Sequence, residues 1–294
     1  MPFTDILPQL LVNGLIAGAI YALAASGFSL VYYVLKFQYF SQGAIMTIGA
    51  YSFFAFFTSM KIGYVTAGIL SVIVSILAAL ITNWIVYRPL RRRKATPVTL
   101  LITSIVLLMF SSSLILALFG SSAKTIPFSN KTYDFGMFTI TLLQIWIIAS
   151  SIVLFFALWL VLKFTRLGKA MRAIADNKDV AQIIGINPEK IYTFTFVIAS
   201  VLGAFAGILL GLEQNLYPRM GVLVIVKGFI GAVVGGITSV PGSIIGGLTV
   251  GVVENIGIWF LPSGYKDVIS FTILLVFLLL RPQGIFGVRL RDDS

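Results

Sequence analysis

The sequence contains no cysteine and no histidine among its 294 residues. These absences exclude disulfides, thiolate and imidazole metal sites, and every catalytic mechanism that needs a cysteine or a histidine. Charge is scarce as well, because charged residues make up 11% of the chain, against about 25% in an ordinary soluble domain. So little charge cannot cover a protein with polar surface, and the sequence therefore predicts a chain that resides in a lipid bilayer.

Hydrophobic residues are abundant, at 59% of the chain, and the mean hydropathy is +1.02. Runs such as Gly63 to Tyr87 exceed the ~20 apolar residues that span a bilayer. The first run lacks the basic start of a signal peptide, so we expect it to be retained as a span. No linker separates two parts of the chain. The sequence thus predicts one all-α, polytopic membrane domain over residues 1–294.

The 21 basic residues outnumber the 10 acidic ones and give a net charge of +11. They are not spread over a soluble face with interleaved aromatics, so nucleic acid is not the expected partner. Instead they gather at the ends of apolar runs, at 88–94, 163–190 and 281–291. The positive-inside rule places such segments in the cytoplasm. The net positive charge therefore indicates which segments of the membrane protein are cytoplasmic. Membrane lipid is the expected surrounding partner.

Working outward from these segments, nine crossings fit the chain, with the N-terminus outside and the C-terminus in the cytoplasm. The glycine-rich stretch Gly228 to Ser243 allows a broken or re-entrant segment, so the predicted range is eight to ten crossings. The nine predicted spans lie near 6–35, 41–60, 63–87, 97–119, 139–162, 191–212, 221–238, 243–261 and 267–281.

A charged segment at about 165–190 interrupts two apolar runs, and its pattern predicts helix, stop, helix. Asp176 or Asn177 is the expected N-cap of a short helix, because a short polar side chain accepts hydrogen bonds from free first-turn amides. With Asp176 as the cap, Asp179 falls at the third helical position. Gly185 is the expected left-handed residue after the helix. The next letters, NPE, are typical of a further helix start.

The short helix is amphipathic, because Val180, Ile183 and Ile184 lie on one face at a spacing of three and four residues. Two interpretations stay open on spacing alone. The apolar face packs on the chain's own helix ends or the lipid interface, or it docks in a groove on a cytosolic partner. The sequence contains no GxxxxGK[ST] motif and so no visible means of hydrolysing ATP. A partner that hydrolyses ATP would supply what the chain lacks.

Several blocks resemble the permeases of branched-chain amino acid ABC importers. They are "LGKAMRAIADNKDVAQIIGINPEKIYTFTFVIASVLGAFAG" (167–207), "YRPLRRR" (87–93), "GGITSVPGSIIGGLTVGVVE" (235–254), "YKDVISFTILLVFLLLRPQGIFG" (265–287) and "GAYSFF" (49–54). The blocks cover nearly the whole length in the expected order. The compact N-terminus and short tail are similar to the LivH type of subunit rather than to the longer LivM type.

This resemblance implies a multi-pass permease of a prokaryotic inner (plasma) membrane that is not itself an enzyme. Its implied partners are a second, LivM-like permease, two ATP-binding subunits and an extracytoplasmic solute-binding protein. ATP and Mg would be bound by the ATP-binding subunits, and this chain would hold no cofactor or metal. In that family the short helix docks on an ATPase subunit. The matching coupling residues here are Asp176, Asn177, Asp179, Val180, Ile183, Ile184 and Gly185.

Four residues are candidates for the translocation path. Lys227 and Glu254 are ionisable residues inside predicted spans, where a charge is costly and suggests function. A structural pair between them is the alternative, equally open for Glu254 and favoured for Lys227. Tyr39, Gln42 and Ala44 stand where the family commonly has Asn, His and Glu. Tyr39 and Gln42 still offer hydrogen-bonding groups, so we include them as path candidates.

Other functions remain open at this point. Relatives of the same group carry urea or short amides, so the solute need not be leucine-like. A secondary transporter driven by an ion gradient is the alternative from another class, and it would favour a relay of intramembrane acids, of which Glu254 is the one convincing member. Dependence of uptake on ATP or on an ion gradient separates these two classes.

Overall fold

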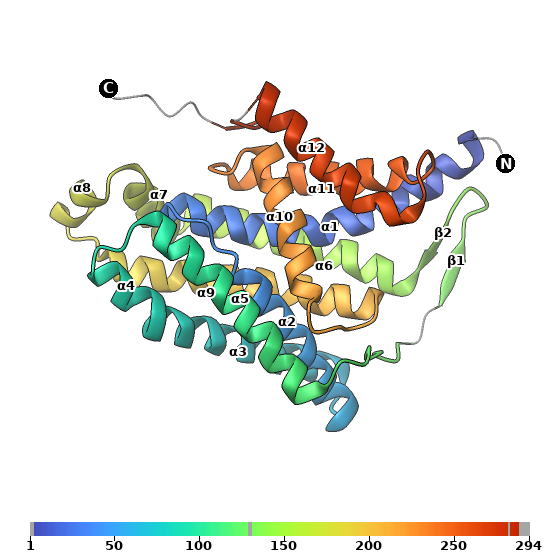
Figure 1. The fold of residues 1–294 in the computed structure, drawn as a ribbon, viewed down its shortest axis with the longest axis horizontal. Coiled ribbons are helices and arrows are strands. Elements are labelled where there is room, and N and C mark those ends of the chain that lie inside the picture. The colour runs from blue at the N-terminus through green and yellow to red at the C-terminus, as the bar shows by residue number, and fades with distance from the viewer. Residues whose placement is uncertain (1–2, 129–130, 282, 288–294) are drawn as a thin grey trace.

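The computed structural model describes residues 3–128, 131–281 and 283–287. They form a bundle of α-helices with one short two-stranded hairpin, which confirms an all-α, polytopic architecture (Figure 1). Within this described part, six helical segments are long and apolar enough to cross a membrane. They are 6–35, 64–92, 97–119, 142–164, 188–213 and 240–257, and each overlaps a span predicted from the sequence.

The first half of the chain is helical apart from short turns. Its elements are α1 (Phe3–Leu35), α2 (Gln42–Phe54), the π-helix η1 (Ala55–Ser59), α3 (Tyr64–Thr82), the π-helix η2 (Asn83–Tyr87), α4 (Arg88–Arg92) and α5 (Pro97–Phe119). At the start of α5 the side chain of Thr96 accepts a hydrogen bond from the Thr99 amide at 3.2 Å, and Pro97 follows the cap. A capping threonine followed by proline is a favoured helix start, which explains why the predicted boundary at residue 97 is correct.

A short antiparallel hairpin of β1 (Thr132–Asp134) and β2 (Thr139–Thr141) precedes the second half. The helices that follow it are α6 (Leu142–Phe164), α7 (Arg166–Asp176), α8 (Lys178–Ile183) and α9 (Pro188–Glu213). Thr141 and Gln144 form a reciprocal capping box at the start of α6. The strand therefore passes directly into a helix, and the amides of Thr141 and Gln144 both have a hydrogen-bond acceptor.

The last elements are α10 (Met220–Gly235), α11 (Val240–Gly257), the 3₁₀-helix η3 (Ser263–Tyr265) and α12 (Lys266–Leu280). The glycine-rich stretch supplies the turn between α10 and α11, where Gly236 has a φ of +107°. With 16 residues, α10 is about 24 Å long, shorter than the ~30 Å hydrocarbon core. It crosses α1 at a steep angle (Figure 1). The predicted cytoplasmic tail residues Arg289 and Arg291 lie outside the described residues.

The core of the bundle is built around α1 and α9. In the most apolar stretch of α1, 89% of the residues are buried, compared with 22% in the segment 64–92 and 17% in α6. The inner helices approach closely through glycines, since Gly18 of α1 faces Gly251 of α11, and Gly207 of α9 lies on the backbone of Met46 in α2. Such contacts let helices associate in lipid, where apolar burial does not drive packing.

The two ends of the bundle carry different features. The short helices α4, α7 and α8 lie together at one end, and the β1–β2 hairpin lies at the opposite end (Figure 1). The end with α8 is the one that the basic segments assign to the cytoplasm. The hairpin end is the one that they assign to the outside.

Candidate functional site

Helix α7 anchors the charged segment to the bundle. The Thr165 side chain caps its start by accepting from the Gly168 amide at 3.1 Å. Met171 and Ile174 are buried on one face of α7, and the Arg172 guanidinium donates to the carbonyl of Leu162 on α6. This amphipathic helix therefore holds the polar segment against the ends of the membrane helices.

The residue that caps α8 is Asn177. Its side-chain oxygen accepts hydrogen bonds from the amides of Asp179 and Val180, both at 3.0 Å. Of the two predicted caps, Asn177 is thus confirmed, and Asp176 is the last residue of α7. Asp179 lies at the second helical position instead of the third, still in the first turn, where an acid complements the helix dipole.

The end of α8 is fixed by Gly185, as the sequence predicted. Gly185 has a φ of +87°, its amide donates to the Gln182 carbonyl at 3.0 Å, and the Ile186 amide donates to the Ala181 carbonyl at 3.0 Å. These two bonds are the Schellman arrangement that closes a helix. Asn187 then caps α9 by accepting from the amide of Glu189 at 3.0 Å. The helix, stop, helix pattern is confirmed.

The apolar face of α8 is exposed in this chain. Val180, Ile183 and Ile184 are 53%, 83% and 67% exposed, while Ala181 is buried. Packing of this face against the chain's own helix ends is therefore wrong, and a partner or the lipid interface remains as its cover. Three branched aliphatic side chains beyond the ends of the membrane helices form a small apolar knob, which we call the α8 knob.

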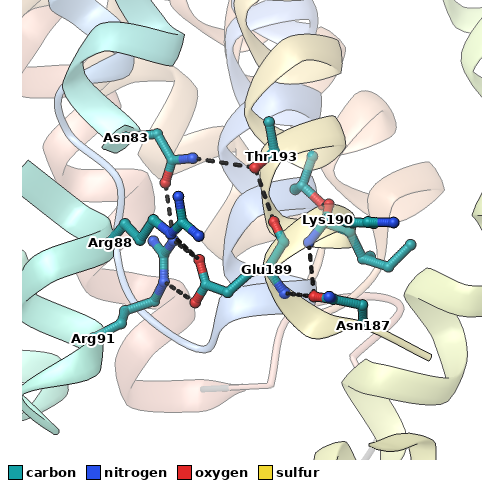
Figure 2. A network of polar contacts seen from close by, with 9 residues as sticks. Asn83, Arg88, Arg91, Asn187, Glu189, Lys190 and Thr193 are labelled. Carbon is teal, nitrogen blue, oxygen red and sulfur yellow. Dashed lines mark hydrogen bonds and ion pairs between the residues drawn. The ribbon is translucent and has the colours of Figure 1, made fainter. Parts of the chain in front are cut away.

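An arginine–glutamate pair braces the turn that follows α8. The Arg91 guanidinium of α4 donates to both carboxylate oxygens of Glu189, at 2.9 and 3.4 Å, and Arg88 lies 3.9 Å from the same carboxylate (Figure 2). The Arg91 side chain is 12% exposed. A two-point pair of this kind fixes geometry as well as contributing energy. We call it the α4–α9 brace.

Further contacts extend the brace into the bundle. Arg91 also donates to the side-chain oxygen of Asn83 at 3.0 Å, and the Asn83 amide donates to Thr193 at 3.4 Å (Figure 2). The guanidinium stacks over the ring of Tyr192 at 5.0 Å. The start of α9 is thereby locked to η2 and α4, which follow α3.

Tyr39 lies directly behind this brace in an aromatic cluster. Its ring packs edge-on against Phe196 of α9 and Tyr87 of η2, with centroids 5.0 and 5.6 Å away. The Tyr87 hydroxyl is 2.6 Å from the Ser41 hydroxyl, at the start of α2. Tyr39 is buried. The structure therefore brings a path candidate and the end of the predicted coupling segment into one contiguous set of contacts.

Gln42 is buried between three inner helices. Its side chain lies on Gly27 of α1 and on Gly203 of α9, and its amide donates to the Ala24 carbonyl at 3.4 Å. The side-chain oxygen of Gln42 has no hydrogen-bond partner within the described part of the chain. A buried acceptor without a hydrogen-bond partner lowers the stability of the folded protein. The junction of α1, α2 and α9 therefore carries a buried polar group among apolar helices.

Lys227 and Glu254 form an ion pair between α10 and α11. Lys227 also lies 3.1 Å from the Asp267 carboxylate of α12 and donates to the Tyr21 hydroxyl of α1 at 3.3 Å. The structural pair that the sequence left open is thus present. Asp267 was missed as a member, because nothing local in the sequence links residue 267 to residue 227.

The basic segment at 87–94 was interpreted only as a topology signal. Its role in the brace was missed, because Arg91 and Glu189 are 98 residues apart in the chain. The signal available in the sequence was weak. It was an acidic residue in the first turn of one membrane-spanning helix and a basic cluster at the end of another.

Comparison with known proteins points to one family. Residues 10–278 match the family model described as branched-chain amino acid transport system / permease component. The chain is 35% identical to the BraD permease protein of the high-affinity branched-chain amino acid transport system of Pseudomonas aeruginosa, and 34% identical to the corresponding LivH protein of Salmonella typhimurium. Each alignment covers 95% of both chains.

More distant similarities agree with the fold. The chain is 29% identical to a probable LivH permease of Methanocaldococcus jannaschii, covering 95% of this chain and 92% of that protein. Among solved structures, PsaBC from Streptococcus pneumoniae matches 97% of both chains with a TM-score of 0.55 and 13% identity. At that identity the match concerns the fold alone.

Proposed function

Because the chain belongs to the family of permease components of branched-chain amino acid transport systems, we propose that it forms half of the translocation pathway of an ATP-driven importer for branched-chain amino acids. The observation that carries this proposal is similarity along nearly the whole chain to BraD and LivH proteins. The protein is an integral membrane protein of the inner membrane, as these relatives are permeases and its helices are apolar enough to span a bilayer.

The proposed complex contains four kinds of subunit. This permease would pair with a second, LivM-like permease, and two ATP-binding subunits would hold ATP and Mg on the cytoplasmic side. A solute-binding protein would deliver the amino acid from outside. In this arrangement the permease has no ATPase of its own and needs no cofactor, because its partners supply the chemistry.

The proposed topology follows the basic segments. Residues 1–294 form one permease domain with the N-terminus outside, the C-terminus in the cytoplasm and nine crossings. The coupling segment at about 165–190 lies in the cytoplasm. Its position beside α4, at the end of the bundle away from the hairpin, supports this orientation (Figure 1).

The proposed coupling step begins at the α8 knob. Val180, Ile183 and Ile184 would insert into a groove of an ATP-binding subunit, with Asp176, Asn177, Asp179 and Gly185 shaping and presenting the helix. Helix-in-groove recognition uses such spacing of apolar anchors. Exposed branched aliphatics on a helix held at both ends support this step, because little conformational freedom is lost when the partner binds.

Movement of α8 would reach the pathway through the α4–α9 brace. Only three residues separate Gly185 from Glu189, and Arg91 ties that glutamate to α4 and η2. The aromatic cluster then connects η2 to Tyr39 and the start of α2. Near the same point burial lowers the pKa of Lys36, and the Asp176 carboxylate partly offsets that shift. The charge of Asp176 therefore acts on Lys36, which directly follows α1.

The alternatives are not favoured by the relatives. The full-length relatives compared above are described as branched-chain amino acid permeases, not as urea or amide carriers or ion-driven transporters. Glu254, the residue on which the ion-driven alternative depended, is paired with Lys227.

Reconstituted uptake tests the proposal. The complete complex, placed in proteoliposomes with its solute-binding protein, is expected to accumulate leucine, isoleucine or valine when ATP is enclosed with the ATP-binding subunits. Accumulation is expected to persist when ionophores remove proton and sodium gradients. Uptake that disappears with the gradients and not with ATP would reverse the assignment. Preference for urea over leucine would leave ATP-driven import supported and would refute the assignment of branched-chain amino acids as the solute.

A double substitution, Asp179→Lys with Ile183→Glu, tests the α8 knob. We expect normal insertion, loss of co-purifying ATP-binding subunits and loss of uptake, because a charge is placed in an apolar contact. A matched control on the exposed hairpin is Asp134→Lys with Met137→Glu, which is expected to retain the ATP-binding subunits. Normal uptake by the α8 variant would refute the coupling role of this helix.

A further inference from the structure

A polar cavity of about 290 Å³ opens at the hairpin end of the bundle. It is bounded by α1, α6, α9, α11 and the start of α12. Gln9 of α1 ties the hairpin to this rim, because its side chain accepts from the Thr139 amide at 2.8 Å and donates to the Thr139 carbonyl at 3.2 Å. The volume is close to the lower end of the range for small-molecule sites, about 300 Å³. A small solute therefore fits the space.

The cavity contains one carboxylate and one ammonium group. Glu213 closes α9 and Lys266 opens α12, and both side chains line the cavity. Within residues 3–128, 131–281 and 283–287, neither forms an ion pair with any group, including each other. Both residues are half-buried. Two opposite charges thus line one cavity without neutralising one another.

Both charges sit at the helix end that disfavours them. Glu213 is the last residue of α9, where the helix dipole already places partial negative charge, and Lys266 is the first residue of α12, where it places partial positive charge. Neither residue therefore stabilises its own helix through the dipole. A cation at Glu213 and an anion at Lys266 would be favoured by the side chain and by the helix end together.

The Glu213 carboxylate is held in place from behind. The Gln144 amide donates to one of its oxygens at 3.1 Å, while the Gln144 carbonyl oxygen is fixed by the Thr141 amide at 3.0 Å in the capping box. The carboxylate keeps capacity to accept further hydrogen bonds. A group positioned in this way is prepared to receive an ammonium with little loss of side-chain freedom.

The remaining lining completes the pattern. Ile16, Ile20 and Leu210 provide an aliphatic wall, and Asn13 and Asn255 provide carboxamides. Tyr21 also lines the cavity, and its hydroxyl accepts a hydrogen bond from Lys227. The cavity thus offers a carboxylate for a cation, an ammonium for an anion and an aliphatic wall. A free aliphatic amino acid in its zwitterionic form matches all three.

We propose that this cavity is the entry site where the permease receives the free amino acid, with the ammonium group at Glu213, the carboxylate at Lys266 and the aliphatic side chain against Ile16, Ile20 and Leu210. The inference rests on the proposed function, since it names the point at which that function takes up its solute. It also assigns selection of the zwitterion to the permease itself, in addition to the solute-binding protein that delivers it.

Binding to the assembled permease–ATPase complex in nanodiscs, without the solute-binding protein, tests the site. The probe is radiolabelled L-leucine, competed by unlabelled leucine, by 4-methylpentanoate, which lacks the ammonium, and by 3-methylbutylamine, which lacks the carboxylate. Each analogue is expected to compete about tenfold more weakly or worse, as expected for loss of one charged hydrogen bond. Equal competition by all three compounds, or no leucine binding, would overturn the proposal without any variant.

Two substitutions separate the two charges. Glu213→Gln is expected to abolish the preference for leucine over 4-methylpentanoate and to keep the preference over 3-methylbutylamine. Lys266→Met is expected to give the reverse. Asp134→Asn and Lys131→Gln, on the exposed hairpin segment, are matched controls that should retain both preferences. Wild-type preferences in both cavity variants would overturn the proposal.

ATP-driven uptake by the wild-type complex keeps the two proposals apart. Uptake without the expected charge preferences refutes the entry site and leaves the importer function intact. Absence of ATP-driven uptake of any branched-chain amino acid refutes the importer function itself. If a variant no longer co-purifies with the ATP-binding subunits, the proposal is tested by the analogue series on the wild-type protein. Absence of either charge preference there would overturn the entry site.

Discussion

Arg91 of α4 and Glu189 of α9 are separated by 98 residues in the chain, yet the guanidinium donates to both carboxylate oxygens at 2.9 and 3.4 Å. Glu189 lies four residues after Gly185, which closes α8, and Arg91 lies over the ring of Phe196, which packs against Tyr39. The pair therefore ties the turn that follows α8 to the inner helix α9 and to the helices that precede α5.

Breaking the brace should weaken both stability and coupling. Glu189→Gln or Arg91→Met is expected to destabilise the protein by about 1–3 kcal/mol. Glu189→Gln removes the charged acceptor of a mostly buried guanidinium, and Arg91→Met leaves the Glu189 carboxylate without its main donor. Thermal inactivation of the detergent-solubilised complex measures the first effect. The ratio of leucine transported to ATP hydrolysed measures the second, and we expect it to fall.

The matched control for the brace is Arg92→Met, which removes an exposed arginine from the same short helix. It should change neither measurement. The double variant Arg91→Met with Glu189→Gln should cost less than the sum of the single changes, since each single change already removes the interaction. Strict additivity would show that the two residues act independently.

Gly185 should be replaceable by asparagine but not by valine. Its φ of +87° lies in the left-handed region, and no atom stands within 4 Å of a side-chain carbon built there. The cost of substitution therefore comes from the backbone alone, about 1–2 kcal/mol for an ordinary residue and less for asparagine. Retention of the ATP-binding subunits during purification should decrease for Gly185→Val and stay near wild type for Gly185→Asn. Equal retention by the two variants would contradict this explanation.

Neutralising Glu254 should be more harmful than neutralising Asp267. Glu254 is 1% exposed and Asp267 is 55% exposed, although both contact Lys227. Removing the buried partner leaves a mostly buried ammonium, a loss of about 3 kcal/mol, whereas water replaces the exposed partner. Thermal inactivation should thus shift strongly for Glu254→Gln and slightly for Asp267→Asn. Adding Lys227→Met to Glu254→Gln should recover part of the loss, and a further decrease would argue against a structural pair.

The absence of cysteine allows a direct test of topology. Single cysteines at Lys131 and Lys178, both exposed, can be labelled with a membrane-impermeant maleimide. Lys131→Cys should be labelled from outside once the outer membrane is permeabilised and the inner membrane is still intact. Lys178→Cys should be labelled only after the inner membrane is permeabilised as well. The reverse pattern would invert the proposed orientation, and labelling of both sites from outside would refute an odd number of crossings between them.

Much of the local structure was predictable because its causes lie close together in the chain. Asn177, Gly185 and Asn187 bond to backbone groups within a few residues, so the start and stop of each helix are set by neighbouring side chains. The predicted start of α5 at residue 97 is correct for the same reason. The choice between Asp176 and Asn177 as the cap was not predictable, because either side chain can accept those amides and only the path of α7 decides between them.

The sequence by itself determined that this protein belongs in a membrane, which stretches form its apolar helices, and where the charged segment at 165–190 interrupts them. These features depend on composition and on contacts between near neighbours. Only the tertiary structure decided that Arg91 meets Glu189, that the α8 knob faces away from the bundle, and that Glu213 and Lys266 line one cavity. Those relationships join residues far apart in the chain, and close packing of helices through small residues such as Gly18 and Gly207 fixes which faces meet.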